Sequence, residues 1–237
     1  MSRTGRWTAI LATRRLRGKA HAAAAIGHHA KPMSTLPRNG IYAITDGQPH
    51  RLVERSEQAL AGGVAMIQYR DLSDDHPRRF AEAKALVMLC ARYGRPLIVD
   101  HDIALAQAVG AAGVHLSQAE GGPAAARAVL GAQSIVGMSC YASAELAVAS
   151  ARAGASYVSF GAFFPSPTKP HAGRAPVDLL RQTATLGIPR VAIGGITPDN
   201  GRLLIDAGAE FIATVSAIYG ASDTHAVAAE MATLFTA

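Results

Sequence analysis

The stretch that decides the fold is Val109-Gly110-Ala111-Ala112-Gly113-Val114-His115-Leu116, where a small-Gly-small triplet ends a helical segment and a short apolar strand follows. Glycine ends a helix well because it takes the left-handed conformation, and its small neighbours let helix and strand pack closely. The same arrangement recurs at 61–68, 153–160 and 207–215. This recurrence predicts that helices and strands alternate along the chain.

Further short apolar strands lie between these repeats, two of them after the Gly-x-Pro turns at 94–96 and 187–189. Continuous apolar character is typical of parallel strands that are buried on both faces. Eight strands separated by helical segments predict a single (β/α)8 TIM barrel of the α/β class. The alternative is an open doubly wound sheet, which normally has fewer strands and an earlier glycine-rich loop. The predicted strands are 41–45, 64–68, 97–99, 113–116, 134–138, 157–160, 191–193 and 211–215.

The positive charge of the chain is concentrated at its beginning. Residues 1–38 hold eight Lys or Arg and no acidic residue, which leaves 15 basic and 17 acidic residues for 39–237. We therefore expect a basic N-terminal extension at 1–38 and the barrel at 39–237. The extension has three interpretations: a disordered tail, an organelle-targeting segment, or upstream sequence before a true start at Met33.

Composition excludes several classes of protein. The chain is 49% hydrophobic and 17% charged, which is a globular profile. Because the barrel segment is nearly neutral, we expect no nucleic-acid partner, and no apolar run is long enough to predict a membrane span. Two cysteines, Cys90 and Cys140, are too few for a disulfide framework, which favours a reducing, cytoplasmic location.

In a TIM barrel the chemistry takes place just after the strands, so the residues there form one ring around a common mouth. Arg70 follows the second predicted strand, and its planar guanidinium can hold two phosphate oxygens. The alternative for Arg70 is an ion pair at the rim with Asp71 or Asp74.

Titratable residues also follow the third and fourth strands. We expect Asp102 to cap the next helix and Asp100 or His101 to face the mouth. His115 lies within an apolar strand and is interpreted as a core residue with satisfied hydrogen bonds. Glu120 lies beyond the same strand, where its carboxylate could reach a metal ion.

The loop after the sixth strand carries the most chemistry. Ser166, Thr168 and Lys169 lie between prolines, and hydroxyl and ammonium donors are what a phosphate or a leaving diphosphate needs. The alternative is a solvated loop with incidental polar residues. Ser139, after the fifth strand, could donate to a phosphate or begin a turn.

The last two strands end in a pattern known from phosphate-binding barrels. Gly194-Gly195 follows the seventh strand, and Val215-Ser216 opens a short helix after the eighth. TIM barrels often bind phosphate at these two loops and at a short helix there.

These runs together resemble the thiamine-phosphate synthase family over residues 40–220. The resemblance implies a TIM-barrel transferase that joins hydroxymethylpyrimidine diphosphate to a thiazole phosphate, with Mg2+ as cofactor. The products are thiamine phosphate and diphosphate. The motifs that carry the resemblance are IYAITDG, IQYRD, PLIVDHD, GVHLSQAE, GMS, FGAFFPSPTK, VAIGGITPDN and VSAI, in that order.

The resemblance also implies roles for individual residues. Arg70, Lys169 and Ser139 match catalytic positions. His101 and Glu120 stand at the metal positions, with Asp100 as an alternative oxygen ligand. The substrate-binding positions are matched by Gln68, Arg70, Asp100, Ser139, Ser166, Thr168, Lys169, Gly195, Val215 and Ser216.

The chain departs from the family pattern at several positions, including Ser117 in place of a glycine and Ala119 in place of an acidic residue. Leu72 stands where the family has a lysine, and Asp100-His101 replaces the usual Asn-Asp pair. Glu120 replaces an aspartate. An imidazole at position 101 is unfavourable for Mg2+, which prefers oxygen ligands. The departures lie in the half of the site expected to hold Mg2+ and diphosphate, whereas the thiazole-phosphate half is nearly intact.

This asymmetry leaves two other functions open. A thiazole tautomerase-like isomerase would bind only the thiazole phosphate, but that relative has a histidine where Tyr141 stands here. A non-catalytic protein would bind thiazole phosphate or thiamine phosphate without turnover. In each case we expect small phosphorylated ligands, and a homodimer is the expected assembly.

Overall fold

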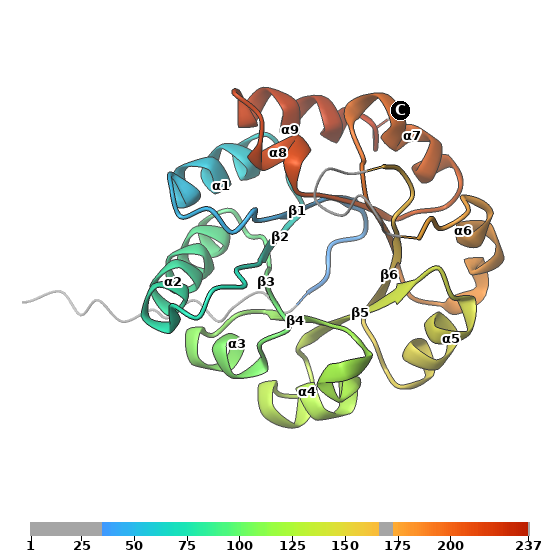
Figure 1. The fold of residues 1–237 in the computed structure, drawn as a ribbon, viewed down its shortest axis with the longest axis horizontal. Coiled ribbons are helices and arrows are strands. Elements are labelled where there is room, and N and C mark those ends of the chain that lie inside the picture. The colour runs from blue at the N-terminus through green and yellow to red at the C-terminus, as the bar shows by residue number, and fades with distance from the viewer. Residues whose placement is uncertain (1–34, 166–172, 237) are drawn as a thin grey trace, which may run out of the picture. The chain divides into compact units, whose positions relative to one another are not determined.

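Eight parallel strands close into a barrel in chain order in the computed structural model, which describes residues 35–165 and 173–236. Strand β1 pairs with β8 to close the ring (Figure 1). The prediction of a single (β/α)8 barrel is confirmed. The strands are β1 (Gly40–Ile44), β2 (Met66–Tyr69), β3 (Leu97–Asp100), β4 (Gly113–Leu116), β5 (Ile135–Tyr141), β6 (Tyr157–Gly161), β7 (Arg190–Ile193) and β8 (Phe211–Thr214).

The helices form the outer layer around this barrel (Figure 1). Gly110 and Gly154, the central residues of two predicted helix-ending triplets, have φ angles of 75° and 88°, so both take the left-handed conformation. The helices are α1 (Leu52–Ala61), α2 (His76–Arg92), α3 (Ile103–Val109), α4 (Gly122–Leu130), α5 (Ala144–Arg152), α6 (Asp178–Gln182), α7 (Pro198–Asp206), α8 (Ser216–Tyr219) and α9 (Thr224–Thr233), with short 3-10 turns at η1 (Gln118–Glu120) and η2 (Ala184–Leu186).

Alternation along the strands divides the buried residues into two cores. On β1, Ile41 and Ala43 belong to the core between strands and helices, whereas Tyr42 and Ile44 belong to a separate cluster inside the barrel. Side chains two residues apart on a strand share a face, so the positions that follow the inner cluster toward the strand ends also face the interior. This alternation places polar side chains at the mouth.

Strand β5 is longer than predicted. It continues to Tyr141, and the register with β6 shifts between Ser139 and Tyr141. The extra residue, Cys140, is fully buried in the core beneath the helices. A bulge bends a strand locally, and here it lies beside the predicted phosphate contact at Ser139.

The barrel lies within the unit Lys31–Ala237, and most of the expected extension lies outside the described residues. Leu36, which lies before β1, packs against the inner cluster of the barrel. In the described part of the chain, no helix combines the length and apolar character needed to cross a membrane.

Candidate active site

Charged side chains from β2, β3 and the end of β4 meet at one side of the mouth. The guanidinium Nε of Arg70 lies 3.4 Å from Asp100 Oδ2. Asp71 does not share this ion pair, because its carboxylate pairs with Arg78 at 2.8 Å. The Asp100 side chain is only 6% exposed, so Arg70 balances a nearly buried carboxylate and is held by it in return. The expectation that Asp100 faces the mouth agrees with this position.

His101 lies between two carboxylates. Its Nε2 is 3.5 Å from Asp100 Oδ1 and its Nδ1 is 3.1 Å from Glu120 Oε2. The residue has a φ of 57°, a left-handed conformation that interrupts the strand alternation. Both Asp100 and His101 can therefore reach the same cluster. Asp102 caps α3 as predicted, accepting a hydrogen bond from Leu105 N at 2.8 Å.

Glu120 is fixed by its own turn. Its Oε2 accepts hydrogen bonds from the backbone N of Ser117 at 2.6 Å and from Ser117 Oγ at 2.7 Å. Burial alone would raise the pKa of Glu120, but the hydrogen bonds from Ser117 and then His101 bring this pKa below its ordinary value. Glu120 therefore presents a carboxylate anion at the mouth.

These residues allow a test of the expected Mg2+ site. Mg2+ commonly keeps several waters and is bound by one or two carboxylates together with substrate phosphate. Within residues 35–165 and 173–236, no three His, Cys, Asp or Glu side chains converge as a metal cage. Asp100 and Glu120 each offer a carboxylate oxygen of the kind Mg2+ prefers, but they lie against different nitrogens of the His101 ring and so do not share one ion in this arrangement. The imidazole of His101 does not fit Mg2+, because a hard cation prefers oxygen.

Beneath this charged rim, neutral polar groups cross the barrel interior. Gln68 Nε2 donates to the Tyr42 hydroxyl at 2.7 Å, and that hydroxyl lies 2.8 Å from the hydroxyl of Tyr157. The Tyr157 hydroxyl is 3.0 Å from His115 Nδ1, and His115 Nε2 is 3.0 Å from Ser139 Oγ. Two predicted ligands, Gln68 and Ser139, are thus joined through three residues of the interior.

The interior groups are uncharged. Burial lowers the pKa of His115 to about 3, and burial raises the pKa of Tyr42 and Tyr157 above the ordinary value for a phenol. The interpretation of His115 as a hydrogen-bonded core residue is confirmed. The roles of Tyr42 and Tyr157 were not predicted, although each is a hydroxyl-bearing residue on the inward face of an apolar strand.

The opposite side of the mouth is built from close backbone contacts. Gly194 and Gly195 have φ angles of 106° and 64°. A Cβ added at Gly195 would lie 2.2 Å from the carbonyl oxygen of Pro165, so glycine is required for the loop after β6 to approach the loop after β7. Val215 and Ser216 begin α8 on the neighbouring strand end. Gly195, Val215 and Ser216 therefore lie at adjacent strand ends, as predicted.

Ser166, Thr168 and Lys169 lie outside the described residues. Their predicted roles stay predictions. The loop enters this segment at Pro165, which the contact with Gly195 places beside the predicted phosphate half of the mouth.

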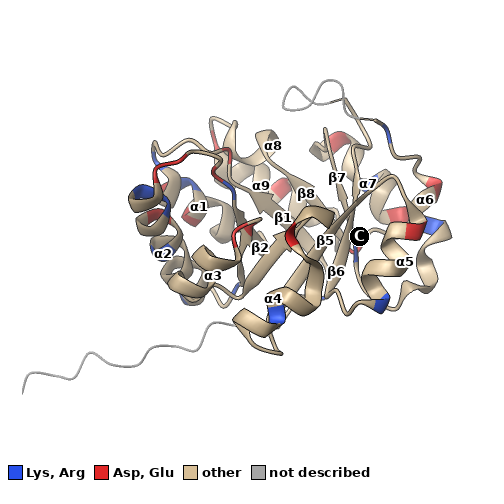
Figure 2. Cartoon of the chain, turned by 60° about the horizontal axis from the view of Figure 1, so that its bottom comes forward, with Lys and Arg blue, Asp and Glu red and all other residues tan. Residues whose placement is uncertain are grey.

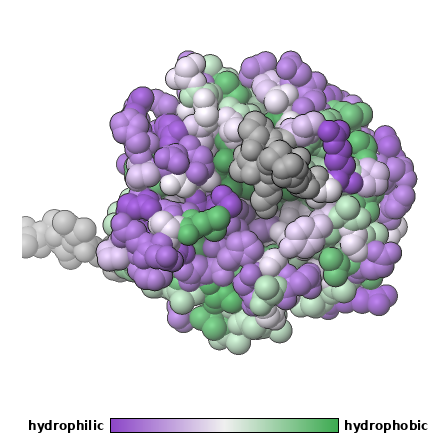
Figure 3. All heavy atoms as spheres, in the orientation of Figure 1, coloured by the Kyte–Doolittle hydropathy of each residue, from purple (hydrophilic) through white to green (hydrophobic). Residues whose placement is uncertain are grey.

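The surface views agree with a polar mouth. Hydrophilic residues gather over the side formed by α1, α2 and α3 (Figure 3). Acidic and basic segments lie on the helices at both sides of the barrel, while β5, β6 and β8 contain no charged residue (Figure 2). A shallow depression beside the cluster is lined by Leu72, Asp100 and His101, among others.

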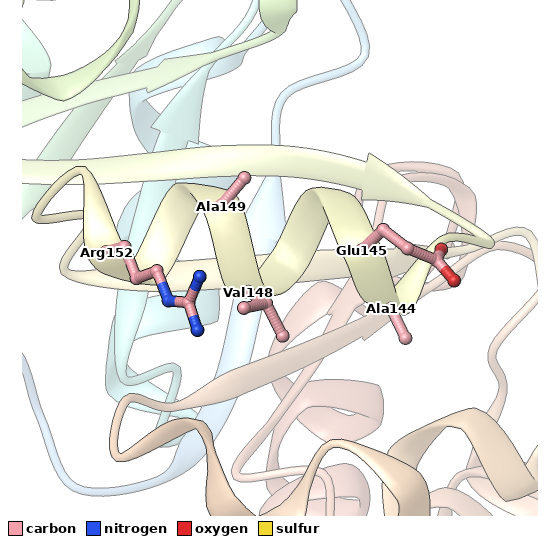
Figure 4. Close-up of a pocket in the computed structure, with 5 residues that line it drawn as sticks. All are labelled: Ala144, Glu145, Val148, Ala149 and Arg152. Carbon is pink, nitrogen blue, oxygen red and sulfur yellow. The ribbon is translucent and has the colours of Figure 1, made fainter.

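A second depression follows α5 and is lined by Ala144, Glu145, Val148, Ala149 and Arg152 (Figure 4). It lies along the helix, and none of its lining residues belongs to a strand end. The candidate site is therefore at the mouth of the barrel, not in this depression.

A closed parallel barrel with Arg70, the hydroxyls of Ser139 and Ser216, and a paired-glycine loop at its carboxyl end is typical of a TIM-barrel enzyme that acts on phosphorylated substrates. The family model described as thiamine monophosphate synthase matches residues 41–218. The chain belongs to this family.

Individual relatives agree with the family model. A thiamine-phosphate synthase from Thiobacillus denitrificans is 50% identical over 208 residues, covering 86% of this chain and 98% of the relative. A thiamine-phosphate synthase from Thioalkalivibrio sulfidiphilus is 46% identical, covering 83% and 95%. The solved structure of thiamine phosphate pyrophosphorylase from Pyrococcus furiosus aligns with a TM-score of 0.76 at 31% identity, covering 84% of this chain and 96% of the other.

Proposed function

We propose that this enzyme is a thiamine-phosphate synthase, a transferase that joins hydroxymethylpyrimidine diphosphate to a thiazole phosphate. Relatives up to 50% identical over nearly their whole length support this activity. In the structure, the supporting observation is that Arg70, held 3.4 Å from Asp100, lies at the same mouth as Ser139 and the Gly195 loop. Two phosphorylated substrates would therefore bind between a side that carries the positive charge of Arg70 and a side that carries the Ser139 hydroxyl and the Gly195 loop.

The proposed reaction breaks the bond between the pyrimidine methylene carbon and the diphosphate oxygen. The aminopyrimidine stabilises the carbocation that remains, and the thiazole nitrogen supplies the electron pair of the new C–N bond. Positioning and stabilisation of the departing anion are the main demands on the protein. Arg70 and Lys169 would provide positive charge, and Ser139 would provide a hydroxyl donor.

We propose the remaining substrate contacts from the positions of the residues around the mouth. Gln68 and Asp100 would contact the pyrimidine diphosphate. Ser166 and Thr168, together with Gly195, Val215 and Ser216, would hold the thiazole phosphate.

We propose Mg2+ as the cofactor. Glu120, or Asp100 as the alternative oxygen ligand, would hold it together with water and substrate oxygens, and it would neutralise charge on the diphosphate. Activity should disappear when the metal is chelated and return when Mg2+ is added. Full activity after exhaustive chelation would contradict this cofactor.

The function is tested by incubating the purified protein with both substrates and Mg2+ and detecting thiamine phosphate. We expect turnover well above that of the Lys169→Ala variant. No product, with thiazole phosphate still bound, would contradict the synthase and favour a tautomerase-like or non-catalytic role. Tyr141, which replaces the histidine of the tautomerase-like relative, argues against the former.

We also propose a cytoplasmic homodimer without a nucleic-acid partner. Val53 on α1 and Phe80 and Met88 on α2 are between 41% and 59% exposed, which supports contact with a second copy through neighbouring helices. Light scattering coupled to size-exclusion chromatography should give twice the monomer mass of 24.6 kDa. A monomer mass at micromolar concentration would contradict the dimer.

A further inference from the structure

The interior hydrogen bonds form a single chain with a defined beginning and end. The chain runs through Gln68 of β2, Tyr42 of β1, Tyr157 of β6, His115 of β4 and Ser139 of β5, with successive contacts between 2.7 and 3.0 Å. Its first four members are buried, and only Ser139 is partly exposed. Ser139 is therefore the more exposed end of the chain.

With Gln68 Nε2 facing Tyr42, as the structure places it, one direction of these hydrogen bonds is selected. Gln68 Nε2 can only donate, so the oxygen of Tyr42 accepts and its hydrogen is available for Tyr157. Tyr157 then accepts from Tyr42 and directs its own hydrogen at His115 Nδ1. In this arrangement both buried phenol hydrogens have an acceptor, as buried polar groups require.

The His115 imidazole passes the same donor-to-acceptor direction on to Ser139. A neutral imidazole that accepts at Nδ1 carries its hydrogen on Nε2. Nε2 lies 3.0 Å from Ser139 Oγ and 3.4 Å from Ser159 Oγ, so Ser139 is the nearer acceptor. Ser139 Oγ then accepts from within the protein, and its own hydrogen is left to point toward the mouth.

We propose that this chain sets the Ser139 hydroxyl as a donor to an anionic ligand oxygen, which makes Tyr42, Tyr157 and His115 positioning residues for Ser139. The benefit to catalysis rests on the function proposed above, in which that oxygen belongs to the diphosphate. With the opposite direction, Ser139 would donate to His115 and would present only lone pairs to the anion. The tyrosines thus determine whether Ser139 attracts or repels the departing group.

The direction can be measured without substrate. Long-range 1H–15N correlation spectra of the protein labelled at histidine report which ring nitrogen carries the hydrogen, and the His115→Gln variant identifies the relevant signals. We expect His115 to be the neutral form with hydrogen on Nε2 and none on Nδ1. Hydrogen on Nδ1 would overturn the proposal, whether or not the protein is a synthase.

Kinetics test whether the direction matters for catalysis. Tyr157→Phe should lower kcat/KM for the pyrimidine diphosphate about tenfold, the effect of misdirecting one hydrogen bond to an anion, and leave the KM for thiazole phosphate within about twofold. The matched control is Tyr69→Phe, which removes a phenol that donates to Glu82 on α2. The control should stay within about twofold of the natural protein.

A double variant separates positioning from general damage to the fold. If Tyr157 acts through Ser139, the Tyr157→Phe change should have little further effect on kcat/KM in the Ser139→Ala background. Additive losses would overturn the proposal. If the natural protein shows no turnover, the function proposed above fails, and the histidine spectra still decide the direction of the chain.

Discussion

The rim and the interior of the mouth hold polar groups by different means. On the rim, Arg70, His101 and Glu120 are charged or titratable and partly open to water, and they pair with one another or with the nearly buried Asp100 at 3.1 to 3.5 Å. In the interior, polar groups such as His115 are neutral and linked by hydrogen bonds of 3.0 Å or less. Solvent weakens an exposed ion pair such as His101 with Glu120, whereas leaving a buried polar group unpaired destabilises the fold.

Three departures from the expected family pattern lie on the exposed part of the rim, and a fourth, Asp100, has a side chain that is only 6% exposed. Leu72, His101 and Glu120 are all on the rim, and the Leu72 side chain is 73% exposed. Neither Gln68 nor Ser139 departs from the pattern. Exposed rim residues can therefore change with little effect on the fold, while the interior chain constrains several strands together.

The largest effect is expected from removing the rim cation. Arg70→Ala should lower kcat/KM by at least about a hundredfold, because it removes a charge from the departing anion and leaves Asp100 without its guanidinium. Steady-state assays with both substrates measure this loss. The control is Arg92→Ala, which removes an exposed arginine paired with Glu57. A loss below threefold for Arg70→Ala would show that the rim contributes little to catalysis.

The next largest effect is a loss of stability when a side chain is added beside the buried ring of Tyr157. A Cβ added at Gly137 would lie 2.0 Å from Cζ of the fully buried Tyr157. Gly137→Ala should therefore cost about 2–3 kcal/mol of unfolding free energy, since this ring has little room to move. Urea unfolding measures the cost. At Gly173 an added Cβ meets nothing within 4 Å, so Gly173→Ala should be nearly neutral.

A pH series tests the protonation of the interior histidine. The pKa of His115 falls from its ordinary 6.5 to about 3 on folding, so below pH 6.5 the unfolded chain binds a proton that the folded protein does not. This histidine should therefore remove about 2 kcal/mol of stability between pH 7 and pH 5. The difference between the natural protein and His115→Gln in urea midpoints isolates this contribution. An unchanged difference would show that His115 takes up a proton in the folded protein.

The smallest expected effect is an increase in Mg2+ affinity or turnover from two substitutions on the rim. Leu72→Lys combined with His101→Asp restores the family's charges on the rim and should raise Mg2+ affinity or turnover a few-fold. Metal titration of the assay measures both quantities. No gain, with high activity in the natural protein, would indicate that the rim has its own working arrangement.

The sequence predicted the fold because its signals are local. Helix-ending glycines such as Gly110 and short apolar strands mark each βα unit without knowledge of the others. The same holds for Asp102, whose capping role depends only on the following turn.

The site was less predictable where contacts join distant strands. Arg70 pairs with Asp100 rather than with its sequence neighbour Asp71, because adjacent parallel strands end side by side. His101 reaches Glu120 through a left-handed turn that strict alternation does not allow for. The link from Tyr42 to Tyr157 spans 115 positions and carries no local sequence signal.

Closure of the barrel has a consequence for folding during translation. Ile41 of β1 pairs with Ile212 of β8, near the other end of the chain. Because the chain is synthesised from its N-terminus, β1 cannot pair with β8 until almost the whole protein has been synthesised. During that interval β1 is an open edge, and contacts this distant in sequence are slow to form. Chaperones that shield nascent chains would act in that interval.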